Sequence, residues 1–546
     1  MKRHLKFLHL ITVQFILFLT LSLNAQFGIN NFQIVWGETF RGRIDALHII
    51  DAIGRNPSLA SLQKSFFHPL FRNAGKLLVK HTNSLSYSYA TTFQLEVDKK
   101  RTTPTHVLPI GNNDLLTIGK RSGIFQRQQT VYYHYFNKQG TDRKVQGQKI
   151  TEYNRTSRLK SELFTGVALS EDHSKAVIHY SIPVGRNDYP GFGYLLFDEI
   201  RGKSEENLTV LPYKMNELDV YDHFITNKGN YFMIGKEFSG RNIYTPSITT
   251  QGTVLRTRIF SHQKERGLRE IPMTELPFFP QDIKFTEEKD QLLLTGFYAE
   301  SPGADIRGVF FATLDSETLE IRKVTSSPFS REFIETGKAA WEKSYWERVR
   351  SNRNRVTNFN NFKILEFQQT KNGEYIVVAE HQEVEARLKN SNNENASNEK
   401  LDYIYYYEDV LVYKLSKEGE LLWVNRIPKS QRSQNDDGKS SSSLVAITDK
   451  EVYVLFNDNI RNYDNSTKKY QMEDRYPFNA STGNQNVIGV SFIDLSNGIE
   501  LRKMVGGRRE LRTLFIPKKS IFMPETKELY LYGNINRRHR LGYVKL

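Results

Sequence analysis

The sequence predicts an all-β protein, a single β-propeller of about eight four-stranded antiparallel blades, with seven as the alternative. Three observations lead there. Strand-like hairpins recur along nearly the whole chain; 38% hydrophobic and 12% aromatic residues suffice for a packed core; and the absence of Cys leaves core packing and backbone pairing to stabilise the fold. A length of 546 residues would otherwise suggest three or four domains. A repeat fold allows one ring instead.

The first segment, residues 1–25, has the pattern of a secretory signal peptide. Lys2, Arg3 and Lys6 precede an apolar run that ends at Ala25. An uncleaved membrane anchor is the alternative, but the Ala-Gln step after the run favours cleavage, and no second apolar run could span a bilayer. We therefore expect an exported protein that is periplasmic, outer-membrane-associated or extracellular, without a transmembrane span after cleavage.

The charge of the mature chain is moderately basic. Removing residues 1–25 lowers the net charge from +15 to +12, because that segment has three basic and no acidic residues. A nucleic-acid partner would need this charge gathered into a stripe with a matching motif. Lys and Arg are instead spread along the chain, so we expect no nucleic-acid partner.

The repeat consists of short apolar runs, each preceded by a charged or Gly-bearing turn. Such runs are typical of strands buried on both faces, and the turns have hairpin chemistry. The six clearest runs begin 55 to 84 residues apart; they are 176–180, 231–235, 291–296, 375–379, 452–456 and 529–533. Two weaker runs begin at Leu77 and Leu115, only 38 residues apart. That close spacing is why seven blades remain an alternative to eight.

A second hairpin follows the first in several units. Residues 410–415 turn at Ser416–Gly419 and return at 420–423, and residues 490–495 turn at 496–498 in the same way. Two hairpins per unit make a four-stranded meander, and a series of such meanders predicts a propeller spanning residues 26–546. The last unit ends at its third strand, 541–546. We expect the strand at 32–37 to pair into that blade, which would close the ring and cover two sheet edges.

The signal-peptide ending Leu23-Asn24-Ala25-Gln26 and the repeat resemble those of exported β-propeller proteins of Bacteroidota, whose function is uncharacterised. One unit, Val412–Trp423, is loosely similar to quinoprotein-like propeller repeats, with a Gly turn at Gly419 and a Trp at 423. The other units do not have this Trp, so the resemblance implies no quinone cofactor. It implies a fold without an activity.

Two segments depart from the repeat. Residues 331–356 place Ile334, Trp341, Tyr345 and Val349 near one helical stripe, which predicts an inserted helix. The stripe either packs on the rim of the propeller or forms a docking surface of the aromatic and Arg residues favoured at interfaces. The candidate partner-binding residues are Trp341, Tyr345, Trp346, Arg348, Arg350 and Arg353.

The second departure is the Asn-rich segment 383–401, expected to be a polar loop insertion. Tyrosines follow it within residues 403–407, where packing against neighbouring strands is the simpler interpretation and a sugar-stacking platform the alternative. Asp436 and Asp437 lie in another polar loop but lack the further spaced carboxylates of a calcium loop.

The search for catalytic motifs finds none. The histidines show no zinc-site spacing, and no nucleophile elbow, phosphate-binding loop or dinucleotide fingerprint occurs. We expect no cofactor and no metal, and the absence of local motifs weighs against an enzyme without excluding one. The leading hypothesis is a non-enzymatic propeller that binds an envelope protein or glycan, including as an accessory of an outer-membrane complex. The alternative is a carbohydrate-active hydrolase or lyase with its site at the channel mouth, since carboxylates from different blades could meet there.

Overall fold

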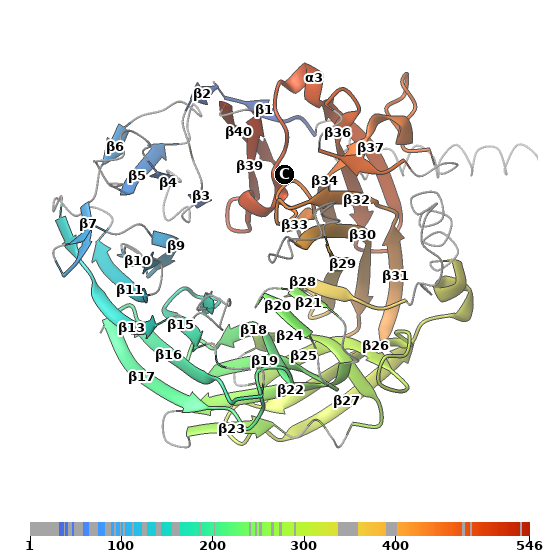
Figure 1. Ribbon diagram of the computed structural model, residues 1–546. Helices are drawn as coiled ribbons and strands as arrows, with labels where there is room; N and C mark the ends of the chain where they lie inside the picture. Colours follow the sequence, from blue (N-terminus) through green and yellow to red (C-terminus); the bar gives the residue numbers. More distant parts are fainter. Residues whose placement is uncertain are drawn as a thin grey trace, which may run out of the picture.

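The computed structural model shows a ring of β-sheets around a central axis (Figure 1). It describes residues 32–546 except 38, 42–45, 49–57, 65–74, 82–88, 92–93, 99, 102–103, 112–113, 123–127, 138–143, 155–163, 183, 185–186, 201, 240–241, 246–247, 251–253, 264–266, 272, 274–275, 289–290, 337–358, 389–400, 472–475, 481–482 and 536–537. The prediction of an all-β propeller is confirmed.

Eight four-stranded antiparallel blades follow one another in the described part of the chain. Their strands, blade by blade, are β3 (Ala46–His48), β4 (Ser58–Lys64), β5 (Gly75–His81) and β6 (Tyr89–Thr91); β9 (Pro104–Ile110), β10 (Asp114–Ser122), β11 (Gln128–Asn137) and β13 (Gln148–Asn154); β14 (Phe164–Leu169), β15 (Lys175–Ile182), β16 (Gly191–Asp198) and β17 (Gly202–Val210); β18 (Leu218–Ile225), β19 (Tyr231–Phe238), β22 (Val254–Gln263) and β23 (Gly267–Ile271); β24 (Phe279–Glu288), β25 (Gln291–Ala299), β26 (Gly308–Asp315) and β27 (Ile321–Pro328); β28 (Phe362–Gln369), β29 (Tyr375–Leu388), β30 (Leu401–Leu415) and β31 (Leu421–Ile427); β33 (Ser443–Ile447), β34 (Glu451–Asn459), β36 (Asn486–Asp494) and β37 (Glu500–Gly507); and β38 (Ile521–Met523), β39 (Glu528–Ile535), β40 (Arg538–Lys545) and β1 (Val35–Trp36).

The remaining elements are short. They are β2 (Phe40–Arg41), which also pairs with β40; β7 (Gln94–Val97), β8 (Lys100–Arg101) and β12 (Lys144–Gln146), which form a small sheet; the hairpin β20 (Asn242–Thr245) and β21 (Ile248–Thr250); β32 (Gln431–Gln434) and β35 (Phe478–Asn479); and the helical turns η4 (Ile460–Asn462), α3 (Arg508–Leu511) and η5 (Pro517–Lys519).

The core lies in the seams between neighbouring blades. On β25, Leu292 and Leu294 pack toward the fourth blade, whereas Leu293 and Phe297 pack toward the sixth. This alternation follows from the two-residue period of a strand. Each middle strand therefore contributes to two seams, which explains why β34 and β36 are buried along their whole length. The apolar runs of the sequence are strands buried on both faces, as predicted.

The short step between the first two units has a simple explanation. Leu115 lies in β10, the second strand of its blade, and the later runs also lie in second strands. Leu77 instead lies in β5, the third strand of the first blade. The second strand of that blade, β4, begins at Ser58, while β10 begins at Asp114. When the second strands of the first two blades are compared, their spacing is like that of the later blades. The prediction was wrong in treating the run at Leu77 as the counterpart of the run at Leu115.

The N-terminal strand lies beside the C-terminal strand. Val35 pairs with Tyr543 and Trp36 with Gly542, so β1 is the outermost strand of the last blade. The Trp36 ring packs on Gly542, where a Cβ atom would lie only 3.1 Å from it. The two ends of the described chain thus share one sheet, and the edge of β40 is covered by a partner.

The sixth blade extends beyond the ring. Residues 383–388 continue β29 and pair with 401–406 of β30, and β32 then adds beside β30. The expected loop 383–401 is therefore wrong at both ends, because residues 383–388 belong to β29 and Leu401 begins β30. Charged residues alternate with Val384, Ala386 and Leu388 in the first of these segments, as in a strand. Residues 389–400 lie outside the described residues.

The ring has two faces that differ in their connections. One, here called the hairpin face, holds the turns between first and second and between third and fourth strands of each blade. The other, the connection face, holds the segments between second and third strands and those that lead from one blade to the next. The long β29–β30 extension and the β20–β21 hairpin belong to the connection face. In propellers, such segments can vary in length and sequence because the packing between blades stabilises the ring without them.

Candidate binding site on the connection face

The six predicted partner-binding residues Trp341, Tyr345, Trp346, Arg348, Arg350 and Arg353 lie outside the described residues. The beginning of their segment is described: residues 331–336 are helical. Ile334 is buried in the seam between the fifth and sixth blades with Phe329 and Phe359. This first turn packs on the propeller, whereas the docking role of the later residues stays a prediction.

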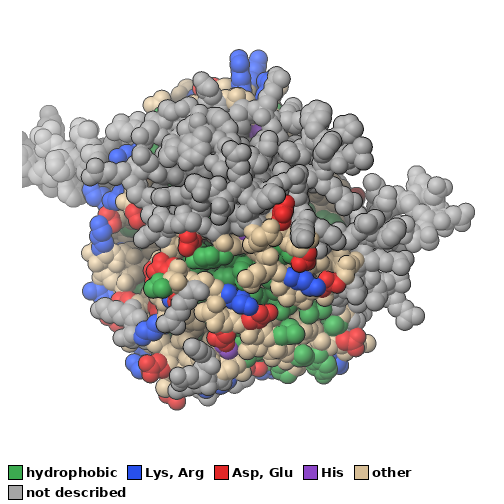
Figure 2. Space-filling view, turned by 90° about the vertical axis from the view of Figure 1, so that its left-hand side faces the viewer, with side chains coloured by type: hydrophobic (Ala, Val, Ile, Leu, Met, Phe, Trp, Pro, Cys, Tyr) green, Lys and Arg blue, Asp and Glu red, His purple; other side chains and the backbone are tan. Residues whose placement is uncertain are grey.

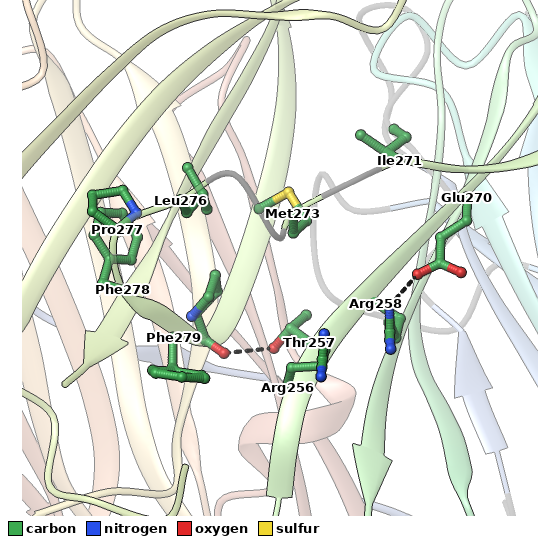
Figure 3. A pocket seen from close by; sticks show the side chains of 11 residues that line it. Arg256, Thr257, Arg258, Glu270, Ile271, Met273, Leu276, Pro277, Phe278 and Phe279 are labelled. Atoms are coloured by element: carbon green, nitrogen blue, oxygen red, sulfur yellow. Dashed lines mark hydrogen bonds and ion pairs between the residues drawn. The ribbon is translucent and has the colours of Figure 1, made fainter. Parts of the chain in front are cut away.

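A cleft opens on the connection face where the fourth blade leads into the fifth. It has a volume of about 410 Å³, within the range of ligand pockets. Figure 3 shows its lining, which comes from β22, β23, the connecting segment and the start of β24; the lining residues are Arg256, Thr257, Arg258, Glu270, Ile271, Met273, Leu276, Pro277, Phe278, Phe279 and Pro280. One wall is apolar and the other carries two arginines.

The apolar wall is held in place by contacts on either side of it. The Phe278 ring packs 4.8 Å from the Tyr298 ring and 5.0 Å from the Phe310 ring, measured between centroids. The hydroxyl of Thr257 donates a hydrogen bond of 2.9 Å to the carbonyl of Pro280, which ties β22 to the start of β24. Met273 and Leu276 are buried. The wall is therefore preformed.

The two arginines of the cleft have different environments. Arg258 donates from Nε to Glu237 at 2.7 Å and from NH1 to Glu270 at 2.6 Å, and it lies 5.5 Å from the centre of the Tyr213 ring. Burial, and then the charge of Glu270, raise the pKa of Tyr213 to about 12, so its phenol stays protonated and donates to Glu270. Arg258 is thus bound by two carboxylates, which hold its side chain against the wall.

Arg256, in contrast, has most of its hydrogen-bonding capacity open. Its side chain is 43% exposed, and its one ion pair in the described part of the chain is a 3.5 Å contact from Nε to Glu237, which also serves Arg258. A guanidinium has five N–H donors in a planar fork that suits a carboxylate. The cleft therefore combines an apolar wall with a cation that can bind an acidic group.

The sequence reasoning did not find this cleft. The available signal was Leu276-Pro277-Phe278-Phe279-Pro280, an apolar segment with two prolines between strands. Prolines fix the backbone and remove donors, so this composition is typical of a rigid connection. The opposing Arg256 and Arg258 come from a strand that was not among the clear repeat members.

Charged side chains belong to the first strands of neighbouring blades, and these strands lie nearest the ring centre in Figure 1. Lys284 of β24 lies 3.3 Å from Asp222 of β18. Burial raises the pKa of Glu366 on β28, and the charge of Lys284 opposes this rise. Asp282 is buried, 3.9 Å from Lys236, and accepts from the backbone N–H of Ile364 at 2.8 Å. The carboxylates here stand beside lysines, an arrangement that clamps neighbouring blades together.

The tyrosines near the Asn-rich segment pack, as the simpler interpretation predicted. Tyr405 and Tyr407 are 6% and 7% exposed. The Tyr405 hydroxyl donates to Asp437 at 2.8 Å. Asp437 is thereby used in holding the strand extension. In the described residues, no three His, Asp or Glu side chains are grouped so as to hold a metal ion.

On the side of the ring that carries β13 and β17, the described residues form no cluster of like-charged side chains. Figure 2 shows basic and acidic side chains interspersed with hydrophobic ones on its described part. Leu208 and Val210 of β17 are exposed there, at 60% and 61%. No helix in the described part of the chain is long and apolar enough to cross a membrane.

Comparisons with protein-family models and with curated proteins find no match. Among solved structures, the chain is similar to the WD40 domain of SCAP from fission yeast, with 12% identity over 95% of each chain and a TM-score of 0.37. It is similar to the β-propeller domain of Nup133 from Vanderwaltozyma polyspora, with 11% identity over 80% of this chain and 99% of that chain and a TM-score of 0.34. For the β-propeller domain of the Trilobed protease from Pyrococcus furiosus, the identity is 9% over 85% of this chain and 96% of that one, with a TM-score of 0.32. These likenesses concern architecture alone, and the strand pairings establish a β-propeller.

Proposed function

We propose that this protein is an exported, non-enzymatic β-propeller that binds a partner of the cell envelope through the cleft between its fourth and fifth blades. Export is supported by the signal-peptide pattern of residues 1–25. Binding is supported by the fold, because a propeller presents a rigid platform whose connections vary without disturbing the ring. The observation that carries the proposal is the preformed cleft with the open guanidinium of Arg256.

The chemistry of the cleft favours a protein partner over a glycan. The apolar wall includes Ile271, Met273 and Leu276 and suits an aliphatic or aromatic side chain. Arg is among the residues enriched at interface hot spots. A glycan would require several hydroxyl-binding groups, whereas the carboxylates near the cleft already bind Arg258. We infer an extended segment that inserts an apolar side chain and places a carboxylate on Arg256.

Affinity purification from envelope extracts tests this proposal with two charge reversals. Arg256→Glu places a negative charge at the cleft, and we expect it to lower partner recovery at least tenfold. Lys149→Glu is the matched control. Lys149 is 46% exposed on the outer strand of another blade, and its carboxylate partner among the described residues is Glu152. Equal recovery with both variants, or recovery of glycan alone, would contradict a protein site in this cleft.

A further inference from the structure

The strand β22 has a free edge where it lines the cleft. On one side, residues 254–262 pair with β19. On the other side, β23 pairs only with residues 259–263, and the last pair joins Ile271 to Ile259. The residue after Ile271 is a proline, which has no N–H with which to continue the ladder. In the described part of the chain, no strand therefore pairs with this side of residues 254–258.

The cleft lies along this free edge. Neighbouring residues of a strand point to opposite faces of the sheet, yet Arg256, Thr257 and Arg258 all line the cleft. A cleft that is lined from both faces of one strand must open along the edge of that strand. The apolar wall lies across from Arg256 and Thr257 (Figure 3). The N–H and C=O groups of alternate residues at this edge therefore point toward the cleft.

The two faces of β22 differ in chemistry at this edge. Ile259 and Ile271 pack in the seam toward the fifth blade, which makes one face apolar. Arg256 and Arg258 belong to the opposite face by strand alternation, and both contact Glu237 there. A segment lying along the edge would thus meet apolar side chains on one face and arginines on the other.

A strand added along this edge would have to match both faces. Its side chains alternate, so those on one face would reach the apolar wall and those on the other would approach Arg256. Glu237 and Glu270 bind Arg258 at 2.7 and 2.6 Å, so the guanidinium with open donors is that of Arg256. Charged side chains at an edge also discourage pairing with strands that do not complement them. These features select acidic and apolar residues in alternation.

We propose that the partner of this cleft is an extended segment of alternating acidic and apolar residues that adds to β22 as a further strand. The inference rests on the proposed function and goes beyond it, because it assigns the binding mode and the sequence pattern of the partner. Backbone hydrogen bonds to the free edge would hold the segment, and the two faces would select its side chains, as is usual for strand addition.

Fluorescence anisotropy of labelled peptides with the full-length protein tests the sequence pattern. One short peptide alternates Glu and Val, and a second has the same residues in two blocks, all Glu before all Val. Only the alternating peptide can place every carboxylate on one face. The block peptide should bind about tenfold more weakly, because it loses apolar contact and carboxylates to Arg256. Arg256→Glu should weaken binding of the alternating peptide by a similar factor, and Lys149→Glu should leave it unchanged.

A second readout tests the backbone pairing itself. In an added strand, only every second N–H of the peptide faces β22. The alternating peptide is therefore made with methyl groups on all Glu nitrogens or on all Val nitrogens. One of these two peptides should bind about tenfold more weakly, because it loses its backbone hydrogen bonds to β22. The other should bind nearly as well as the unmethylated peptide.

The outcomes separate this inference from the proposed function. No binding of the alternating peptide, equal affinities of the alternating and block peptides, or equal losses in the two methylated peptides would overturn strand addition. If partner recovery from envelope extract still depends on Arg256 in that case, the proposed function stands and only the binding mode fails. If the peptides behave as expected but Arg256→Glu and Lys149→Glu recover the partner equally, strand addition stands and the proposed function fails.

Discussion

The seam between the fourth and fifth blades and the seam between the sixth and seventh blades have similar interiors and different ends. Both are filled by aliphatic and aromatic side chains from second and third strands. On the connection face, however, the first seam opens into the cleft of Figure 3, and the second is closed by the buried pair of Lys429 and Glu380. The repeated strands form the interior of each seam, and the connecting segments determine whether the seam ends in a cleft or in a buried ion pair on the connection face.

The closed seam should be the more fragile of the two to a single charge deletion. Glu380→Ala leaves the buried Lys429 ammonium with the amide oxygen of Gln431 but without its carboxylate partner, and we expect a loss of about 3–5 kcal/mol in the free energy of unfolding. Urea unfolding measures this value. Glu237→Ala at the open seam is the control, with an expected loss of roughly 1 kcal/mol, because Arg258 keeps Glu270 and reaches solvent. Similar losses in the two variants would show that the seams do not differ in this way.

A third seam, between the third and fourth blades, should add an acid-sensitive case to the comparison. The rings of His179 and His223 stack there with centroids 3.2 Å apart, and His223 bonds the Tyr231 hydroxyl through Nδ1 at 2.6 Å. Burial lowers the pKa of His223 to about 3, although the negative charge of Asp222 opposes this change. The pKa of His179 is also lowered, first by burial and then by the charges of His223 and His106.

These histidines bind protons more weakly in the folded than in the unfolded chain. Their contribution to stability is complete above pH 6.5 and is lost at lower pH, for His223 as the pH falls toward 3. The free energies of unfolding at pH 7 and pH 4, measured with urea, should therefore differ, and His223 should contribute about 3 kcal/mol to the difference. His223→Gln should reduce that difference. An unchanged difference in the variant would show that this seam is no more acid-sensitive than the rest of the ring.

The smallest effect on stability is expected at the open cleft. Arg256→Glu breaks one 3.5 Å contact of a half-exposed side chain, so the urea midpoint should stay close to that of the wild type. Because partner recovery should nevertheless fall, stability and binding would separate in this one variant. A large shift of the midpoint would instead assign Arg256 to the structure of the seam.

The strands that are buried on both faces were predictable from the sequence. The buried runs at 176–180, 291–296 and 452–456 lie in second strands because a strand packed on both faces needs continuous apolar residues. In the first blade the apolar run lies in the third strand, β5, whereas the second strand, β4, has no continuous apolar run. The repeat was therefore assigned to the wrong strand there. Residues 383–388 alternate charged residues with Val384, Ala386 and Leu388, which is a strand pattern, and they pair with β30. The prediction of a loop followed the Asn-rich residues after them and overlooked this alternation.

The candidate sites were less predictable, because they depend on contacts between distant segments. The strand that carries Arg256 faces the segment that leads into the next blade. Composition showed only a basic chain with scattered Lys and Arg.

Site-specific photo-cross-linking tests the central claim most directly. A photoreactive amino acid is placed at position 256 or at the control position 149, and the full-length protein is irradiated in envelope extract. If the cleft binds a protein segment, position 256 should give a discrete cross-linked product that is absent at position 149 and is competed away by unlabelled wild-type protein but not by Arg256→Glu. Products of equal yield at both positions, or competition by Arg256→Glu as strong as by the wild type, would contradict binding through this cleft.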